Sequence, residues 1–179
     1  MTVGLADRNF INPCGVGLWP AAPILVLAVG NLLLQDDAAG LKMLEQLSSR
    51  NFGDEVEFVD GGTQGLALLG QLTGREILVV LDAVALGDNP GTIHVLRGAD
   101  LDELRARRSS TSHESNVLEL LAYAKLLGYE PREVVVVGIE PESIRTGITL
   151  SRTVQAALPA ALACASAAIQ SARRQCLCA

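Results

Sequence analysis

The chain has 179 residues, of which 49% are apolar, and carries a formal net charge of −6. This length and composition are typical of one globular domain, and the acidic excess with only six aromatic residues disfavours nucleic acid as a partner. The sequence contains neither an uninterrupted apolar stretch of about 18 residues nor a secretory signal, so we expect a cytoplasmic protein without a membrane span. The four cysteines lack CxxC spacing, which predicts reduced thiols.

Composition divides the chain into three parts. Residues 1–22 contain several glycines and prolines without a sustained period, which indicates an N-terminal extension. We expect residues 23–172 to form a single α/β domain. Residues 173–179 are expected to form a short C-terminal tail, which holds Cys176 and Cys178.

Strand-like and helix-like segments alternate through the domain. Continuous apolar runs at 24–30, 76–84 and 133–140 predict strands covered on both faces, and the alternating run 55–60 predicts a more peripheral strand. Helical patterns occupy residues 38–49, 65–72, 114–128 and 151–172. The run 91–98 follows the strand before it too closely for a crossover helix, so we expect an antiparallel edge strand. The pattern predicts a three-layer α/β sandwich with a mostly parallel, doubly wound sheet of about five strands.

Three of the predicted helices carry specific signals. Gly40 lies inside the first, where glycine costs about 1 kcal/mol relative to alanine, so we expect this helix to approach the strand beneath it closely. Thr111 and Glu114 have capping-box spacing, which predicts that a helix starts near Ser112. Its predicted buried face comprises Val117, Leu120, Leu121, Ala124 and Leu127. Pro159 is expected to break, kink or restart the last helix.

Two adjacent acids follow the first predicted strand. In an open parallel sheet, ligands bind beyond the carboxyl ends of the strands, where the strand order reverses. The segment at that position, GNLLLQDDAAG, contains Asn31, Asp36 and Asp37. Paired carboxylates would repel a phosphate but suit a cation. Each acid has an alternative role as a helix cap, because a carboxylate stabilises a helix N-terminus by about 0.3 to 1 kcal/mol.

Two further residues are expected at the same edge of the sheet. Asp82 ends the strand 76–84, although an acid at a strand end is by itself typical of a turn. His113 follows a polar loop, ARRSSTS, and falls in the first turn of the next helix. Two carboxylates and an imidazole suit a divalent ion such as nickel or zinc better than calcium or magnesium. His94 is interpreted as a strand-face residue, and the GxSxG and HExxH motifs are missing.

Four ordered motifs and one histidine match a known family of peptidases. The motifs are VLAVGNLLLQDDAAG, FVDGGTQGLALLG, VVLDAV and VVVVGIEPESIRTGITLSRTV, and the histidine precedes the helix 114–128. On these segments, which span about residues 23–172, the sequence resembles the hydrogenase maturation proteases. These endopeptidases remove a C-terminal extension from the large subunit of nickel-iron hydrogenases. The sequence departs from the family in its N-terminal extension, in its cysteine-bearing tail and at Arg152, where LSP is common.

The resemblance implies a site made of Asp37, Asp82 and His113. In the family, these positions contact a nickel ion already inserted in the substrate. Such ligands also suit other divalent ions, such as zinc, or cadmium in crystals. It also implies supporting residues that orient the site or seat the substrate tail: Asn31, Asp36, Asp60, Gly61 and Gly62. Asp36 would cap the helix or orient its neighbour. The alternative for the two glycines is an ordinary tight turn.

The implied partner is the large-subunit precursor of a nickel-iron hydrogenase, cut by a monomeric enzyme. Two mechanisms of peptide-bond hydrolysis are alternatives. In one, the metal activates a water molecule and a carboxylate acts as the general base; in the other, the metal only positions the substrate. Two other classes of function are alternatives, a nickel-checking chaperone that does not cut and a flavodoxin-like binding module.

Overall fold

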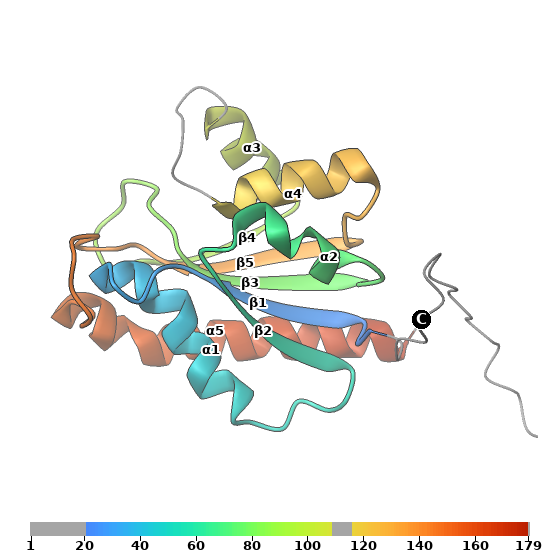
Figure 1. Ribbon diagram of the computed structural model, residues 1–179. Helices are drawn as coiled ribbons and strands as arrows, with labels where there is room; N and C mark the ends of the chain where they lie inside the picture. Colours follow the sequence, from blue (N-terminus) through green and yellow to red (C-terminus); the bar gives the residue numbers. More distant parts are fainter. Residues whose placement is uncertain (1–20, 109–115, 179) are drawn as a thin grey trace, which may run out of the picture.

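The chain forms a five-stranded sheet between two layers of helices in a computed structural model, which describes residues 21–108 and 116–178 (Figure 1). The predicted N-terminal extension, apart from its last two residues, lies outside these ranges. In chain order the elements are β1 (Ile24–Val29), η1 (Gln35–Ala38), α1 (Ala39–Ser48), β2 (Val56–Gly62), η2 (Gly65–Leu68), α2 (Leu69–Leu72), β3 (Ile77–Ala83), β4 (Ile93–Arg97), α3 (Ala99–Arg108), α4 (Asn116–Leu127), β5 (Glu133–Ile139) and α5 (Arg152–Leu177).

The strand order is β2-β1-β3-β5-β4, and the first three pairings are parallel. β4 runs antiparallel to β5 at one edge of the sheet, as the short link before it predicted. The chain passes from β1 to β2 on one side and then returns to β3 on the other side of β1. The crevice between β1 and β3 is therefore the point where the strand order reverses.

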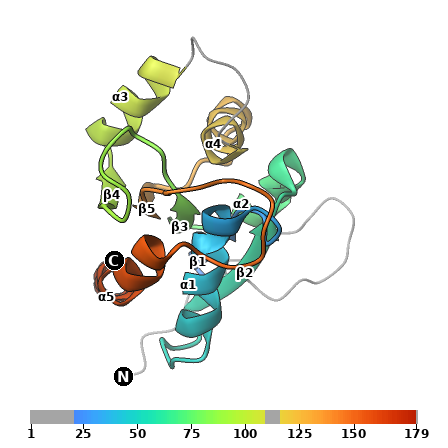
Figure 2. The ribbon, with the colours of Figure 1, turned by 90° about the vertical axis from the view of Figure 1, so that its left-hand side faces the viewer.

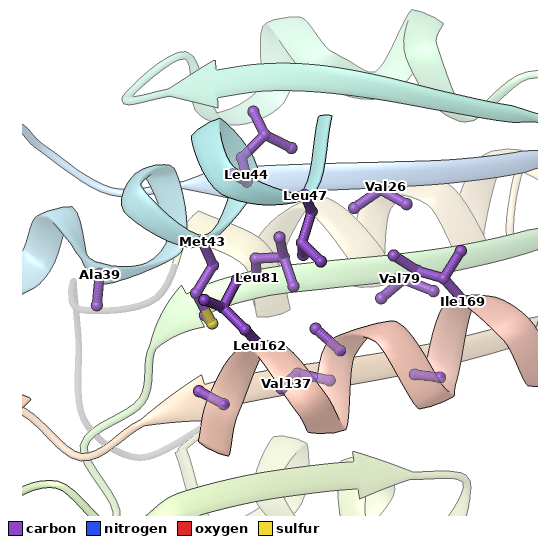
Figure 3. Close-up of a cluster of buried hydrophobic side chains, with 14 of the residues drawn as sticks. Val26, Ala39, Met43, Leu44, Leu47, Val79, Leu81, Val137, Leu162 and Ile169 are labelled. Carbon is purple, nitrogen blue, oxygen red and sulfur yellow. The ribbon is translucent and has the colours of Figure 1, made fainter. Parts of the chain in front are cut away.

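Both faces of the sheet are buried, which explains the continuous apolar runs. Alternate residues of β1 point to opposite faces: Val26 packs with α1 and α5, whereas Leu25 packs with α2 and α4. Figure 3 shows the first cluster, in which Met43 and Leu47 of α1 and Leu162 of α5 lie against the strands. The predicted doubly wound α/β sandwich is confirmed.

The last helix is longer and more regular than its sequence predicted. α5 begins after Ser151, whose hydroxyl accepts a hydrogen bond from Val154 N–H at 3.2 Å, and it continues through Pro159 to Leu177. The expected break at Pro159 is wrong. Pro159 and Gln155 are exposed, so water can solvate the carbonyl that lost its helical donor. α5 also extends beyond residue 172, into the range expected to be a tail.

α5 is the one helix in the described ranges that is long and apolar enough to cross a membrane by length and composition. Its apolar face lies against the sheet, as in Figure 1, with Val154, Ala161 and Ile169 fully buried. Core helices of soluble proteins pass the same test, so this property carries little weight.

The segment between β4 and α4 differs from the prediction. Part of the expected polar loop, residues 106–108, belongs to α3, whose first turn holds Asp100 and Asp102 and whose Leu101 is buried. The predicted start of the next helix near Ser112 lies outside the described residues. The buried face of α4 is confirmed from Val117 to Ala124, but Leu127 is exposed because the helix ends there.

Candidate functional site

The segment that follows β1 folds back over the carboxyl end of the strand and positions Asp37 there. Gly30 adopts φ +133°, and a Cβ at this position would collide with the backbone carbonyl of Asp37, so only glycine fits. The next residue, Asn31, donates its backbone N–H to Asp37 Oδ2 at 2.7 Å. Asp37 is thereby held directly over the end of β1.

Helix α1 starts across the ends of two strands. A Cβ at Gly40 would collide with the backbone carbonyl of Leu81 in β3 and lie 2.8 Å from the carbonyl oxygen of Val29 in β1. The close approach predicted for Gly40 is confirmed. Asp82 follows Leu81, and its Oδ1 accepts a hydrogen bond from Ala83 N–H at 2.8 Å. Asp37 and Asp82 therefore lie at the carboxyl ends of neighbouring strands, on either side of the crevice where the strand order reverses.

The two carboxylates differ from ordinary surface acids in their surroundings. Burial raises the pKa of Asp37 above its usual value, and the hydrogen bond from the Asn31 backbone opposes that rise. Both side chains are half-buried, which leaves one part of each open to solvent or a ligand. A desolvated carboxylate gains more from a nearby positive charge than an exposed one does.

Asp36 has a structural role that the sequence did not reveal. Its side chain is fully buried and accepts backbone hydrogen bonds from Glu142 and Ser143, both at 3.0 Å, and from Ser151 at 2.6 Å. Neither η1 nor α1 has a side-chain N-cap hydrogen bond, so of the two roles expected for Asp36, capping the helix is wrong and orienting its neighbour stays a prediction. Asp36 instead fastens the segment between β5 and α5 to the start of η1, two segments that lie side by side in Figure 2.

The third expected residue of the site, His113, lies outside the described residues. Within residues 21–108 and 116–178, the structure brings no three His, Cys, Asp or Glu side chains together in a way that could hold a metal ion. The convergence of Asp37 and Asp82 with His113 therefore stays a prediction. The two acids are the part of the site that the structure places.

The DGG segment borders the site at the end of β2. Asp60 Oδ1 accepts a hydrogen bond from Gly62 N–H at 2.9 Å, and Gly62 adopts φ +45°. Gly30 N–H in turn donates to the Gly62 carbonyl at 3.1 Å, which ties this turn to the segment that carries Asp37. Gly61 sits where a Cβ would lie 2.9 Å from side-chain atoms of Leu27 and of a leucine in η2. The positive φ of Gly62 and the close packing around Gly61 both favour glycine in this turn.

A buried pair of polar side chains, His94 and Glu140, was not predicted from the sequence. His94 on β4 and Glu140 after β5 are both buried, and Nε2 of the histidine lies 3.0 Å from Oε2 of the glutamate. The same carboxylate accepts backbone hydrogen bonds from Leu86 at 2.8 Å and Gly87 at 3.1 Å, so it fixes the loop that follows β3. The sequence signal for this pair is Glu140, an acid that directly follows the buried strand β5.

The fold and its paired acids define a class of small α/β domains that present carboxylates at the switch point of a parallel sheet. A family model described as hydrogenase maturation protease matches residues 41–168. Hydrogenase 2 maturation protease of Escherichia coli K12 is 38% identical over 78% of this chain and 85% of its own length. The hydrogenase expression/formation protein HupM of Azotobacter chroococcum is 37% identical over 80% and 70%, respectively.

A solved structure gives the same answer. The hydrogenase maturating endopeptidase HybD of E. coli superposes with a TM-score of 0.74 and 35% identity, covering 83% of this chain and 93% of that one. The chain belongs to the hydrogenase maturation protease family, and it is a peptidase.

Proposed function

We propose that this peptidase removes the C-terminal extension of a nickel-iron hydrogenase large-subunit precursor after nickel has been inserted, and that the substrate-bound nickel is its recognition element. The observation that carries the proposal is the position of Asp37 and Asp82. They flank the switch point of the sheet, where ligands of such folds bind, on a scaffold that Gly30 and Gly40 make tight. Family membership supplies the reaction class.

The surroundings of Asp37 suit recognition of a cation. Because burial raises its pKa, the ionised form is destabilised until a positive charge arrives. A nickel ion presented by the precursor would supply that charge and favour the carboxylate form. With Asp82 and His113 as the other ligands, the set of two carboxylates and an imidazole fits a borderline divalent ion such as nickel.

The same residues are candidates for the chemical step. A carboxylate beside the scissile peptide bond could act as a general base toward water, which typically contributes about 10²- to 10⁴-fold. The cytoplasmic location and the monomeric state expected from the sequence stay predictions, as does zinc or cadmium as a substitute ion.

The test is cleavage of purified precursor, prepared with and without nickel and followed by mass spectrometry. The expected result is a shortened large subunit from the nickel-loaded precursor alone. Replacing Asp37, Asp82 or His113 by alanine should each lower the cleavage rate roughly a hundredfold or more. Asp54→Ala is a matched control, because Asp54 is an exposed acid on the loop before β2, at the opposite end of the sheet.

Three results would contradict the proposal in different ways. Equal cleavage without nickel would remove the recognition role of the metal. Normal processing by all three alanine variants would show that the site lies elsewhere. Tight binding of the nickel-loaded precursor without any shortening would favour a chaperone over a protease.

A further inference from the structure

Four large aliphatic side chains are exposed next to the candidate site. Leu32 and Leu33 are 49% and 61% exposed, and Ile144 and Ile148 are 50% and 80% exposed. The two leucines precede η1 and the two isoleucines lie in the segment between β5 and α5. We call these four residues the apolar rim.

The two segments of the apolar rim are joined to each other. Leu34 and Gly147 form an isolated parallel bridge, in which Gly147 N–H donates to the Leu33 carbonyl at 2.8 Å and Gln35 N–H donates to the Gly147 carbonyl at 2.9 Å. Gly147 has no room for a side chain, because a Cβ would lie 2.9 Å from Cγ of Gln35. Leu33 and Ile148 each lie next to a bridged residue, so the bridge brings their two segments together. Figure 2 shows the segment between β5 and α5 passing beside the segment that follows β1.

Partly buried hydrogen bonds hold this surface against the site. The Asp36 carboxylate binds the amides of Glu142 and Ser143, and the Ser143 hydroxyl donates to Gln35 Oε1 at 2.6 Å. Ile144 follows these anchored residues directly, and Asp37 follows Asp36. The rim is therefore fixed in position relative to the candidate site, and its side chains are exposed although the backbone beneath them is tightly bonded.

An exposed aliphatic cluster on a fixed backbone is typical of a protein-binding surface. Four side chains are too few for a stable dimer, which usually buries about 1,200 to 2,000 Å² in total, but they suit the apolar centre of a transient contact. Leu33 lies four residues before Asp37, and Ile144 directly follows Ser143, whose amide binds Asp36, so the rim borders the candidate site. The occupant that fits is therefore the substrate rather than a second copy of the chain.

We infer that the apolar rim docks an apolar segment of the hydrogenase large-subunit precursor next to the bond to be cut. The inference rests on the proposed function for the identity of the precursor. It assigns substrate affinity to Leu32, Leu33, Ile144 and Ile148, and leaves the chemical step to the acids.

The test compares the wild type with the double variant Leu33→Ser/Ile148→Ser. Binding to immobilised nickel-loaded precursor is measured by biolayer interferometry at a temperature where cleavage is slow, and cleavage is measured separately by mass spectrometry. We expect the Kd to rise about tenfold or more, the scale of losing an apolar anchor at the centre of an interface. Leu126→Ser is the matched control, because Leu126 on α4 is 78% exposed and lies away from the rim. Circular dichroism melting checks that each variant folds.

The outcomes separate this inference from the proposed function. A Kd for the double variant within twofold of the wild type overturns the inference, whether or not the precursor is cut. Failure of the wild type to bind the precursor overturns it as well. Binding that weakens in the double variant, without cleavage by any form, supports the rim and refutes only the protease assignment. A wild-type dimer that the double variant abolishes, with an unchanged Kd for the precursor, assigns the rim to self-association and overturns the inference.

Discussion

Replacing Asp36 by alanine is expected to destabilise the fold strongly, whereas replacing its neighbour Asp37 is not. The Asp36 carboxylate accepts three backbone hydrogen bonds in a fully buried position. Each hydrogen bond to a charged group contributes about 1.5 kcal/mol at the low end, so the loss of all three corresponds to roughly 4 to 5 kcal/mol. This is a large part of the typical stability of about 5 to 15 kcal/mol. Asp36→Asn should lose less, because its amide oxygen still serves one or two of the donors.

Urea denaturation followed by circular dichroism measures the free energy of unfolding of each variant. Asp37→Asn is the control, because Asp37 accepts one backbone hydrogen bond, from Asn31, and an amide oxygen can still accept it. We expect Asp37→Asn to be at least as stable as the wild type and to lose cleavage, whereas Asp36→Ala unfolds much more easily. Equal stability of Asp36→Ala and wild type, within about 0.5 kcal/mol, would refute the anchoring role.

Three further perturbations test other parts of the structure. Gly40→Ala should lower the melting temperature, because the new Cβ collides with the Leu81 carbonyl. The collision costs an amount near the upper end of roughly 1 to 3 kcal/mol, which exceeds the gain in helix propensity from glycine to alanine. An unchanged melting temperature would contradict the close approach of α1 to β3. Glu140→Ala should lower the free energy of unfolding in urea denaturation by roughly 4 kcal/mol, because it removes three hydrogen bonds to a buried carboxylate, from His94 and from the amides of Leu86 and Gly87, each contributing about 1.5 kcal/mol. A loss below about 1 kcal/mol would show that these bonds are dispensable. The raised pKa of Asp37 means that the folded state holds this proton more tightly than the unfolded state does, so stability present below the ordinary Asp pKa is lost as pH rises through the raised value. The stability of Asp37→Asn relative to the wild type should therefore increase as pH rises from about 3 to about 7, starting near the ordinary Asp pKa of about 3.9. Melting experiments across this range measure the difference, and a difference that does not change with pH would contradict the raised pKa.

The sequence predicted the architecture well because its signals were local. Each central strand is buried on both faces, so its apolar run has no polar interruptions. The short link before β4 ruled out a crossover helix. Gly40 was a recognisable cost inside a helix, and the contact with Leu81 explains it.

The errors have physical causes that local patterns do not contain. Pro159 removes one helical hydrogen bond, but Gln155 and Pro159 are exposed to water and the opposite side of α5 packs along the sheet, so tertiary contacts preserve the helix. Leu127 fits the apolar period of α4 and is still exposed, because the helix ends at that residue. The pairing of His94 with Glu140 joins two strands that are far apart along the chain.

The adjacent acids show most clearly what a local motif leaves undetermined. Asp36 and Asp37 have the same side chain and neighbouring positions, so either one fits a helix cap or a ligand. Their roles diverge because the amides that bind Asp36 come from residues 106 to 115 positions later, at the end of β5 and the cap of α5. Once these amides hold the Asp36 side chain in the interior, the next carboxylate is left at the crevice, half-buried and with a raised pKa. The buried acid thus fixes the geometry in which the second acid can act, and a pair of aspartates at a switch point should be assigned to roles only after their backbone donors are known.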